Sequence, residues 1–517
     1  MQNKVRELLQ DLGSSKISNV AYDTAWISHT VSLGEYMGKN SLDWIRDHQL
    51  SDGTWGAEKF RHNHDRVICT LAAIIALAKY GTDKDKIRVK RARYGLDFAI
   101  RGLMADTSGA TVGFEMLLPS LLNQAYEAGA LQRSKDLDPW RYTGKSKVHK
   151  NKQRVNGGMA IGRADDLAEI RIQSALQKKL AAQSNGKFDR NVSMVFSAEL
   201  AGEQLSIIDI DNIQEIDGSL AKSPSATAYF ATKVRVGDSL AMAYLRDVSS
   251  HSVDGGIPHF HPFDTYEIAW SLWNLALLNL NKELLFMCKP HLDKLSSAWT
   301  SQGMSYASGC SIFDGDDTTV AFEVLTRFGY EVDVRALLSY EENNYFRCYD
   351  FESDPSIGVN IHALGALREY GYEVDHPAIQ KILHFLEQKF LCDSFWYDKW
   401  HSSPYYSTAH AIIAIAGYAR TDISQSINWI IETQNGDGSW GFYRPTAEET
   451  AYCLQALLIL QRHGEKVPSD ILKRGLDYLS ANMDPPYEPL WLGKCLYTPE
   501  LVVRSAVLSA LVLGEES

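Results

Sequence analysis

Amphipathic helical segments that end at a glycine recur along the chain, whereas signals for β-strands are scarce. Four ranges combine apolar residues at helical spacing with a glycine directly after the last residue: 68–80, 318–328, 357–370 and 446–463. The last range opens with Thr446-x-x-Glu449, which has the spacing of a capping box. Helices of about 12 residues joined by short turns predict helical hairpins that stack into a barrel or a solenoid.

A turn of one type occurs in both halves of the chain. In each copy a glutamine precedes a tryptophan by six residues, with Asp-Gly between them, as in Gln49–Trp55 and Gln434–Trp440. A third copy, Gln214–Leu220, keeps the spacing with leucine in place of tryptophan. Asp-Gly favours a tight turn, the glutamine amide can cap backbone groups, and the tryptophan ring can pack under the next helix. Unless the likeness arose by chance, the repeat predicts two related all-helical domains.

Charge and cysteine usage exclude several classes of protein. The chain has 517 residues, a net charge of −12 and no basic run, so we do not expect nucleic-acid binding. Its seven cysteines form no CxxC pair, which predicts a reduced, cytoplasmic protein and argues against a zinc site. The longest apolar run, residues 68–79, is too short to span a bilayer, and residues 1–13 do not resemble a signal peptide. The sequence therefore predicts a soluble protein without a transmembrane segment.

Three carboxylates lie within four residues at Asp314-Gly-Asp316-Asp317, directly before an apolar helical segment. An aspartate at a helix start commonly serves as an N-cap, but a cap needs one acid. The run is too short for an EF-hand loop, although other metal ligation is possible. Crowded carboxylates cannot all ionise, so one of them could keep a proton and act as an acid in a dry pocket. The residues alone leave a cap, a metal site and an acid catalyst open.

The Asp-Gly-Asp-Asp run matches the DxDD motif of class II terpene cyclases, and the whole chain resembles the bacterial class II diterpene cyclases. This group includes copalyl, halimadienyl (tuberculosinyl) and kolavenyl diphosphate synthases. The resemblance runs nearly end to end and rests on further segments: residues 18–26, 49–56, 112–115, 223–229, 254–256, 398–400 and 491–497. It implies an all-α fold of two (α/α) barrels, in the βγ architecture. Residues 1–260 would mainly form the γ-type barrel, and residues 261–517 would form the β-type barrel with the DxDD motif. The first helix of the chain could pack with the β-type barrel.

The resemblance also implies a reaction. Members of this family protonate the terminal alkene of geranylgeranyl diphosphate, close two rings through carbocations and keep the diphosphate on the product. An alkene is a very weak base, so the acid must be strong in place and shielded from water. Asp316 would be the proton donor, with Asp314 and Asp317 tuning and holding it. His362 aligns with a position that hydrogen-bonds the acid in plant copalyl synthases, where an imidazole would stabilise the carboxylate left after transfer; the alternative is a core histidine.

The step that ends the cascade departs from the plant pattern. Plant copalyl enzymes hold a water between a histidine and an asparagine, whereas here the asparagine position falls on His259 and the histidine position near Phe196 or Ser197. Loss of this pair allows hydride and methyl shifts before a proton leaves, which favours a halimane or clerodane (kolavenyl-type) product. His259 and His261 are candidates for the final base. The alternatives are a labdane-type copalyl product, water capture, a drimenyl product from farnesyl diphosphate, and a non-catalytic prenyl-binding barrel.

Further site residues lie in the segments that resemble the family. Four aromatic residues could shield the cation, or could be ordinary core residues: Tyr229, Trp270, Trp299 and Tyr406. The acidic magnesium motif of the plant enzymes is degenerate here, which leaves Asp106 and Glu115 as candidate ligands of Mg²⁺. Lys179 and Lys494 are candidates for binding the diphosphate, although Lys179 could equally be a solvated surface lysine. The product would pass to a downstream class I terpene synthase or a prenyl-transfer enzyme.

Overall fold

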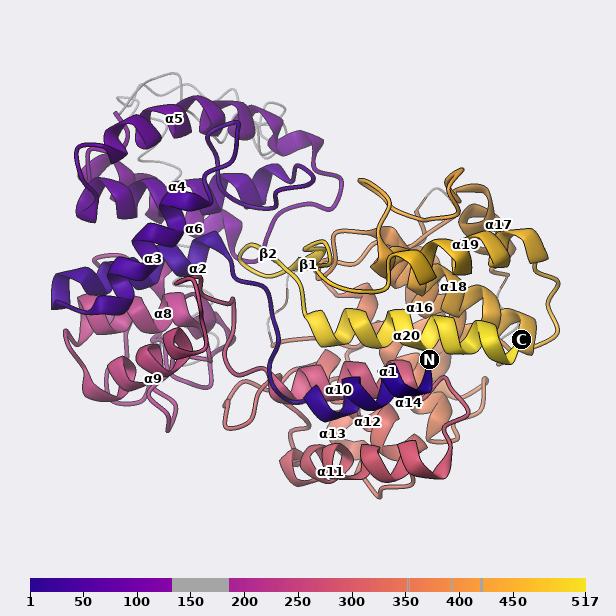
Figure 1. The fold of residues 1–517 in the computed structure, drawn as a ribbon. Coiled ribbons are helices and arrows are strands. Elements are labelled where there is room, and N and C mark those ends of the chain that lie inside the picture. The colour runs from indigo at the N-terminus through magenta and orange to yellow at the C-terminus, as the bar shows by residue number, and fades with distance from the viewer. Residues whose placement is uncertain (133–185, 351, 353, 392–393, 419–421) are drawn as a thin grey trace, which may run out of the picture. The chain divides into compact units, whose positions relative to one another are not determined.

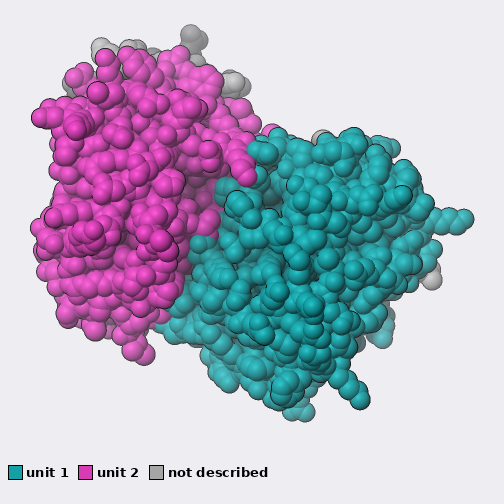
Figure 2. Space-filling model, in the orientation of Figure 1, with its two compact units in different colours: residues 1–17, 262–491, 498–517 teal, residues 18–261, 492–497 magenta. Residues whose placement is uncertain are grey.

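The chain divides into two compact units. The computed structural model describes residues 1–132, 186–350, 352, 354–391, 394–418 and 422–517. Unit 1 comprises Met1–Ile17, Pro262–Trp491 and Thr498–Ser517, and unit 2 comprises Ser18–His261 and Leu492–Tyr497 (Figure 2). The first helix therefore belongs with the C-terminal unit, and a short segment near the C-terminus belongs with the N-terminal unit.

Unit 1 is an (α/α) barrel in the part of the chain that the structure describes (Figure 1). Successive ring helices contact one another, and the last contacts the first: α10 (Asp264–Leu275), α12 (Gly315–Arg327), α14 (Ile357–Glu369), α16 (Pro404–Ile415), α18 (Ala447–Arg462) and α20 (Glu500–Glu516). The remaining helices pack on the outside of this ring: α1 (Gln2–Asp11), α11 (Lys282–Ala298), α13 (Val334–Leu338), α15 (Pro377–Gln388), α17 (Ser424–Glu432) and α19 (Ser469–Ala481).

The apolar surface of each helix decides whether it lies in the ring or outside it. Every residue of α16 is buried, whereas α15 buries a single face. A helix that is apolar all round must be enclosed, and one with a single apolar stripe lies at the surface. At the start of α18, Thr446 Oγ1 accepts the Glu449 N–H at 3.1 Å and donates to the Glu449 carboxylate at 2.7 Å, so the predicted capping interaction forms. None of the described helices combines the length and apolar character needed to cross a membrane.

Unit 2 contains a second, smaller ring. Its described segments contact one another in order and close on the first: α2 (Ala21–Ile27), α4 (Asn63–Tyr80), α6 (Phe114–Glu127), η4 (Ser193–Ala201) and α8 (Pro224–Tyr229). The described part of this unit also contains three longer helices and four short 3₁₀ or π turns: α3 (Tyr36–Asp47), α5 (Asp85–Gly102), α9 (Ser239–Ser250), η1 (Ser28–Leu33), η2 (Leu103–Ala105), η5 (Leu205–Ile207) and η6 (Phe230–Val234). A two-stranded sheet joins β1 (Trp491–Leu492) to β2 (Leu496–Tyr497).

The repeated turn has the same geometry in both units. In unit 1 the Gln434 amide donates to two backbone carbonyls, both at 2.9 Å, and the Trp440 indole donates to a third at 2.6 Å. In unit 2 the Gln49 amide donates to two carbonyls at 2.9 and 3.0 Å, and the Trp55 indole donates to another at 2.8 Å. The predicted capping role of the glutamine is confirmed. Trp396 makes the same indole bond at 2.8 Å without a glutamine six residues before it, so the sequence spacing could not reveal this copy.

Candidate active site

The three aspartates of the DxDD motif take different positions at the start of α12. Asp314 is the N-cap, and its Oδ1 accepts the backbone N–H groups of Asp316 and Asp317 at 2.9 and 2.8 Å. Gly315 is required between them because a Cβ there would lie 2.2 Å from the carbonyl oxygen of Arg347. Asp314 and Asp317 are buried, while the Asp316 side chain keeps 14% of its surface exposed. The cap therefore aims Asp316 alone out of the cluster.

Burial and mutual repulsion favour protonated carboxyl groups in this cluster. Burial raises the pKa of Asp314 to about 6, against the backbone hydrogen bonds that it accepts, and the charge of Asp316 adds to the rise. Burial also raises the pKa of Asp317 well above its usual range, and the negative charge of Asp314 reinforces this. The Tyr349 hydroxyl donates to Asp314 Oδ2 at 3.4 Å. The motif is therefore built to hold a proton near neutral pH.

His362 on α14 lies directly against Asp316. Its Nδ1 is 2.5 Å from Asp316 Oδ1, and the ring is almost fully buried. Burial alone would lower the pKa of His362, but the Asp316 carboxylate and the hydrogen bond to it outweigh burial, so the pKa is raised. A charge-assisted bond of this kind stabilises Asp316 once it has given up a proton.

Two of the predicted aromatic residues surround this pair in unit 1. The ring of Trp270 lies edge-on to His362 with centroids 5.9 Å apart, and the ring of Tyr406 lies 6.3 Å from His362. The Trp270 indole donates to the Tyr406 hydroxyl at 3.3 Å, which fixes both rings. Tyr266 stacks on Trp270 at 4.2 Å. The acid and its histidine therefore adjoin a wall of aromatic rings.

The other two predicted aromatic residues are placed differently. Trp299 packs against Phe322 with ring centroids 5.9 Å apart. Tyr229 belongs to unit 2, where it meets Trp26 edge-on at 6.2 Å and its hydroxyl donates to the carbonyl oxygen of Gly202 at 2.8 Å. These contacts are those of core residues, and a role for Trp299 or Tyr229 at the cation stays a prediction.

Both ring nitrogens of His259 are engaged inside unit 2. Its Nε2 accepts the Lys494 backbone N–H at 3.0 Å, so the ring proton sits on Nδ1, which donates to Asp23 Oδ2 at 2.8 Å. The side chain is fully buried. His259 thus has no lone pair left to accept a proton without breaking one of these bonds. His261 lies nearby in the sequence, with its Nε2 3.7 Å from Asp247.

Lys494 is fully buried in unit 2 rather than offered to solvent. Its ammonium pairs with Glu199 Oε1 at 2.8 Å and donates to the hydroxyls of Ser223 and Ser225 and to the carbonyl oxygen of Phe196 within 2.9 Å. Its three protons are therefore occupied within the protein. A role in diphosphate binding stays a prediction, and so does that of Lys179, which lies outside the described residues.

The predicted magnesium ligands lie in unit 2. Asp106 Oδ1 accepts the Asn63 amide at 2.7 Å, and Oδ2 accepts two bonds from His64, at 2.9 and 2.7 Å. Burial would raise the pKa of Asp106, but the bonds from His64 outweigh it and the pKa is lowered. Glu115 is exposed in the first turn of α6. Magnesium binding by Asp106 and Glu115 stays a prediction.

One residue of the cluster was missed by the sequence reasoning. His410 on α16 lies with its Nδ1 3.0 Å from the Nε2 of His362. A signal was available, because His410 follows His362 by 48 residues and His362 follows Asp316 by 46. A period of this size brings side chains of successive ring helices to the same level of a barrel.

Comparisons with known proteins decide the family. The squalene-hopene cyclase C-terminal domain family matches residues 348–489. A type B diterpene cyclase from Mycobacterium tuberculosis (strain ATCC 25618 / H37Rv) is 37% identical over 517 residues, covering 97% of this chain and 96% of the relative. The chain belongs to the class II diterpene cyclases. An ent-copalyl diphosphate synthase from Streptomyces sp. (strain KO-3988) is 28% identical to this cyclase, covering 92% of its chain and 88% of the relative.

A solved structure agrees with this membership. The ent-copalyl diphosphate synthase from Streptomyces platensis superimposes with a TM-score of 0.78 at 26% identity, covering 99% of each chain. The predicted all-α barrel fold of this class II diterpene cyclase is therefore confirmed. The protein is an enzyme of this class, which sets aside the alternative of a non-catalytic prenyl-binding barrel.

Proposed function

We propose that this enzyme protonates the terminal alkene of geranylgeranyl diphosphate with Asp316 and closes two rings while the diphosphate stays on the product. The observation that carries the proposal is the 2.5 Å contact between Asp316 and the buried His362. A twenty-carbon substrate is supported by relatives named as diterpene cyclases and copalyl diphosphate synthases. Farnesyl diphosphate, which would give a drimenyl product, is the alternative substrate.

The described side chains assign the roles in the protonation step. Asp314 fixes the first turn of α12, so that the Asp316 carboxyl group leaves the buried cluster and can meet an alkene carbon. As the proton leaves, negative charge grows on Asp316 and the hydrogen bond from His362 strengthens. The faces of Trp270 and Tyr406 would each stabilise the carbocation by about 0.5–2 kcal/mol. Each interaction is stronger after proton transfer begins than before, as catalysis requires.

We propose a rearranged halimane or clerodane skeleton for the product, of the halimadienyl or kolavenyl type. His259 uses both ring nitrogens within the fold, and the ring of Phe196 lies edge-on to it at 5.3 Å. This pair does not reproduce a histidine and an asparagine that hold a basic water. Without an early base, hydride and methyl shifts can precede the loss of the final proton. A labdane-type copalyl product is the alternative, and His259 and His261 stay predictions for the final base.

We also propose that Mg²⁺ enters with the substrate. Asp106 and Glu115 would hold the ion, which neutralises charge on the diphosphate when bound. Lys179 is the proposed cationic partner of the diphosphate, and Lys494 is the second candidate, although its ammonium already pairs with Glu199. Because the diphosphate is retained, a class I terpene synthase or a prenyl-transfer enzyme would use the product next.

The test is incubation of the purified protein with geranylgeranyl diphosphate and Mg²⁺, followed by dephosphorylation, mass spectrometry and NMR of the alcohol. A bicyclic diterpene alcohol is expected, and its methyl positions separate the labdane skeleton from the rearranged ones. The Asp316→Asn variant should lose at least about 10²- to 10⁴-fold in rate, while Asp477→Asn on the exposed side of α19 should behave as wild type. Recovery of geranylgeraniol alone from the wild-type reaction would refute the proposal, and farnesyl diphosphate would be tried next.

A further inference from the structure

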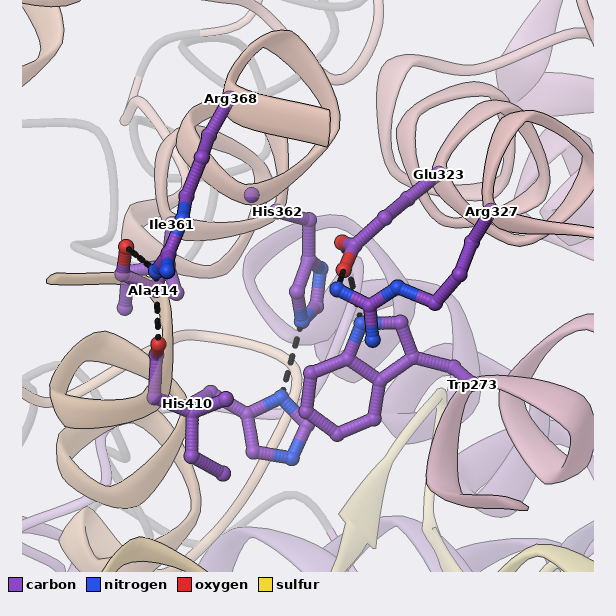
Figure 3. Close-up of a pocket in the computed structure, with 10 residues that line it drawn as sticks. Trp273, Glu323, Arg327, Ile361, His362, Arg368, His410 and Ala414 are labelled. Carbon is purple, nitrogen blue, oxygen red and sulfur yellow. Dashed lines mark hydrogen bonds and ion pairs between the residues drawn. The ribbon is translucent and has the colours of Figure 1, made fainter. Parts of the chain in front are cut away.

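A line of hydrogen bonds runs from the acid through two imidazoles on successive ring helices. Asp316 Oδ1 lies 2.5 Å from His362 Nδ1, and His362 Nε2 lies 3.0 Å from His410 Nδ1. Figure 3 shows the bond between the two rings, with the Trp273 ring beside His410. The Trp273 and His410 rings stack with centroids 4.4 Å apart, which holds His410 in register with His362.

The far end of this line is a buried nitrogen. His410 Nε2 is shielded from solvent and has no hydrogen-bond partner within the described part of the chain. Buried polar atoms are normally paired, so an unpaired one calls for an explanation such as a catalytic role or a bound water.

A cavity adjoins both imidazoles. It measures about 20 Å³, counted as space open to the centre of a water molecule, which is enough for about one water. Charged groups of α12 and α14 share its lining: Glu323, Arg327 and Arg368 (Figure 3). Arg327 pairs with Glu369 at 3.0 Å, and both side chains keep 30% of their surface exposed. A polar site with room for water thus lies between the two histidines and the surface of unit 1.

We infer that His410 and His362 form a proton line that returns a proton from water to Asp316 after each turnover. The inference rests on the proposed function, because only an acid that gives its proton to an alkene must be refilled. His410 acts on Asp316 through His362, so it is a positioning residue for proton transfer.

Both rings are neutral before and after the transfer. Hydronium from the solvent gives a proton to His410 Nε2 and becomes water, His410 Nδ1 passes its proton to His362 Nε2, and His362 Nδ1 passes its proton to Asp316 Oδ1. Three bonds to hydrogen break and three form, and both rings end neutral in the opposite tautomer. The proton that the cascade releases at its end returns to the solvent, so the full cycle consumes no proton. Proton exchange with water then restores the first tautomers.

The pKa shifts of the two histidine rings favour this order of proton transfers. Burial lowers the pKa of His410 well below its usual range, and the nearby charge of His362 lowers it further, so His410 stays neutral and passes a proton without storing it. The pKa of His362 is raised, because the Asp316 carboxylate outweighs burial. The two shifts favour the proton on the side of the acid.

The test is rapid-quench kinetics of the His410→Gln variant with geranylgeranyl diphosphate. A glutamine can still accept a hydrogen bond from His362 but cannot pass a proton on. The proposed function starts with the proton already on the acid, so we expect the first turnover at the wild-type rate and later turnovers slower by at least about tenfold. The product trace would then show a burst of about one equivalent, followed by a slower steady phase. His384→Gln, an exposed site on α15, is the matched control and should show no burst.

Two kinetic results would overturn the inference. If His410→Gln slows the first and later turnovers by the same factor, His410 only holds His362; if it slows neither, the line is not used. Wild-type protein that forms no bicyclic diphosphate would instead refute the proposed function. The ¹⁵N signals of wild-type histidines give a test that needs no variant. His410 should stay neutral at pH 6, and a His410 ring that is protonated there would also overturn the inference.

Discussion

Lys494→Met separates a structural lysine from a substrate-binding one. The ammonium is fully buried and pairs with Glu199 at 2.8 Å, and the Glu199 side chain is itself almost completely buried. Methionine keeps the length of the stem but leaves the Glu199 carboxylate without its cation. Removing one partner of a buried pair costs about 3–5 kcal/mol in unfolding free energy. For a unit of this size, that corresponds to a Tm about 6–20 °C lower.

Thermal unfolding followed by circular dichroism measures this effect, and the KM for geranylgeranyl diphosphate is measured in parallel. Lys233→Met is the matched control, because Lys233 forms an exposed ion pair in the same unit and should cost less than about 1 kcal/mol. Adding Glu199→Gln to Lys494→Met should restore part of the lost stability. A Lys494→Met protein with wild-type Tm and a raised KM would refute this reasoning and assign the lysine to the diphosphate.

Further predictions concern the acid, the helix start and pH. His362→Phe removes a hydrogen bond to a charged group, which is worth about 1.5–3 kcal/mol. We therefore expect kcat to fall about 10- to 150-fold with little change in KM, and an unchanged kcat would contradict this expectation. Gly315→Ala should lower the free energy of unfolding, measured in urea, by about 1–3 kcal/mol, because the new methyl group would lie 2.2 Å from a backbone carbonyl oxygen. Gly436→Ala is the control, because its methyl group would enter open space. Equal stability of the two variants would contradict the geometry. Burial lowers the pKa of His29 to about 3. As the pH falls below 6.5, the His29 imidazole therefore takes up a proton in the unfolded chain but not in the folded one, and the free energy of unfolding decreases. At pH 5.5 the loss is about 1.4 kcal/mol. His29→Phe should remove that part of the pH dependence of unfolding, and an unchanged dependence would show that other groups cause it.

Local sequence patterns predicted the elements of this fold well. The cap at Thr446 and the glutamine turns depend on residues within a few positions of one another, so the chemistry of the segment decides them. The same holds for the DxDD run, where Asp314 caps α12 and leaves Asp316 to point elsewhere. The sequence pattern does not predict the copy of the turn at Trp396, because this copy keeps the indole hydrogen bond but lacks the glutamine.

The resemblance to the family predicted a role for His362, whereas the hydrogen bond from His362 to His410 is seen only in the tertiary structure. His410 reaches His362 because the ring of unit 1 closes with α14 beside α16, and no local pattern encodes that contact.

The same limit explains His259 and Lys494. In the sequence they are polar residues in segments that resemble the family, where His259 could act as a base and Lys494 could bind the diphosphate. In the fold they are joined to each other and to Asp23 and Glu199 across more than 200 positions of the chain. Sequence by itself determined the helical repeat, the turn chemistry, the acidic motif and the family. The tertiary structure decided which polar groups are already paired, because a pairing energy depends on the partner that folding brings within about 3 Å and on the water that it removes.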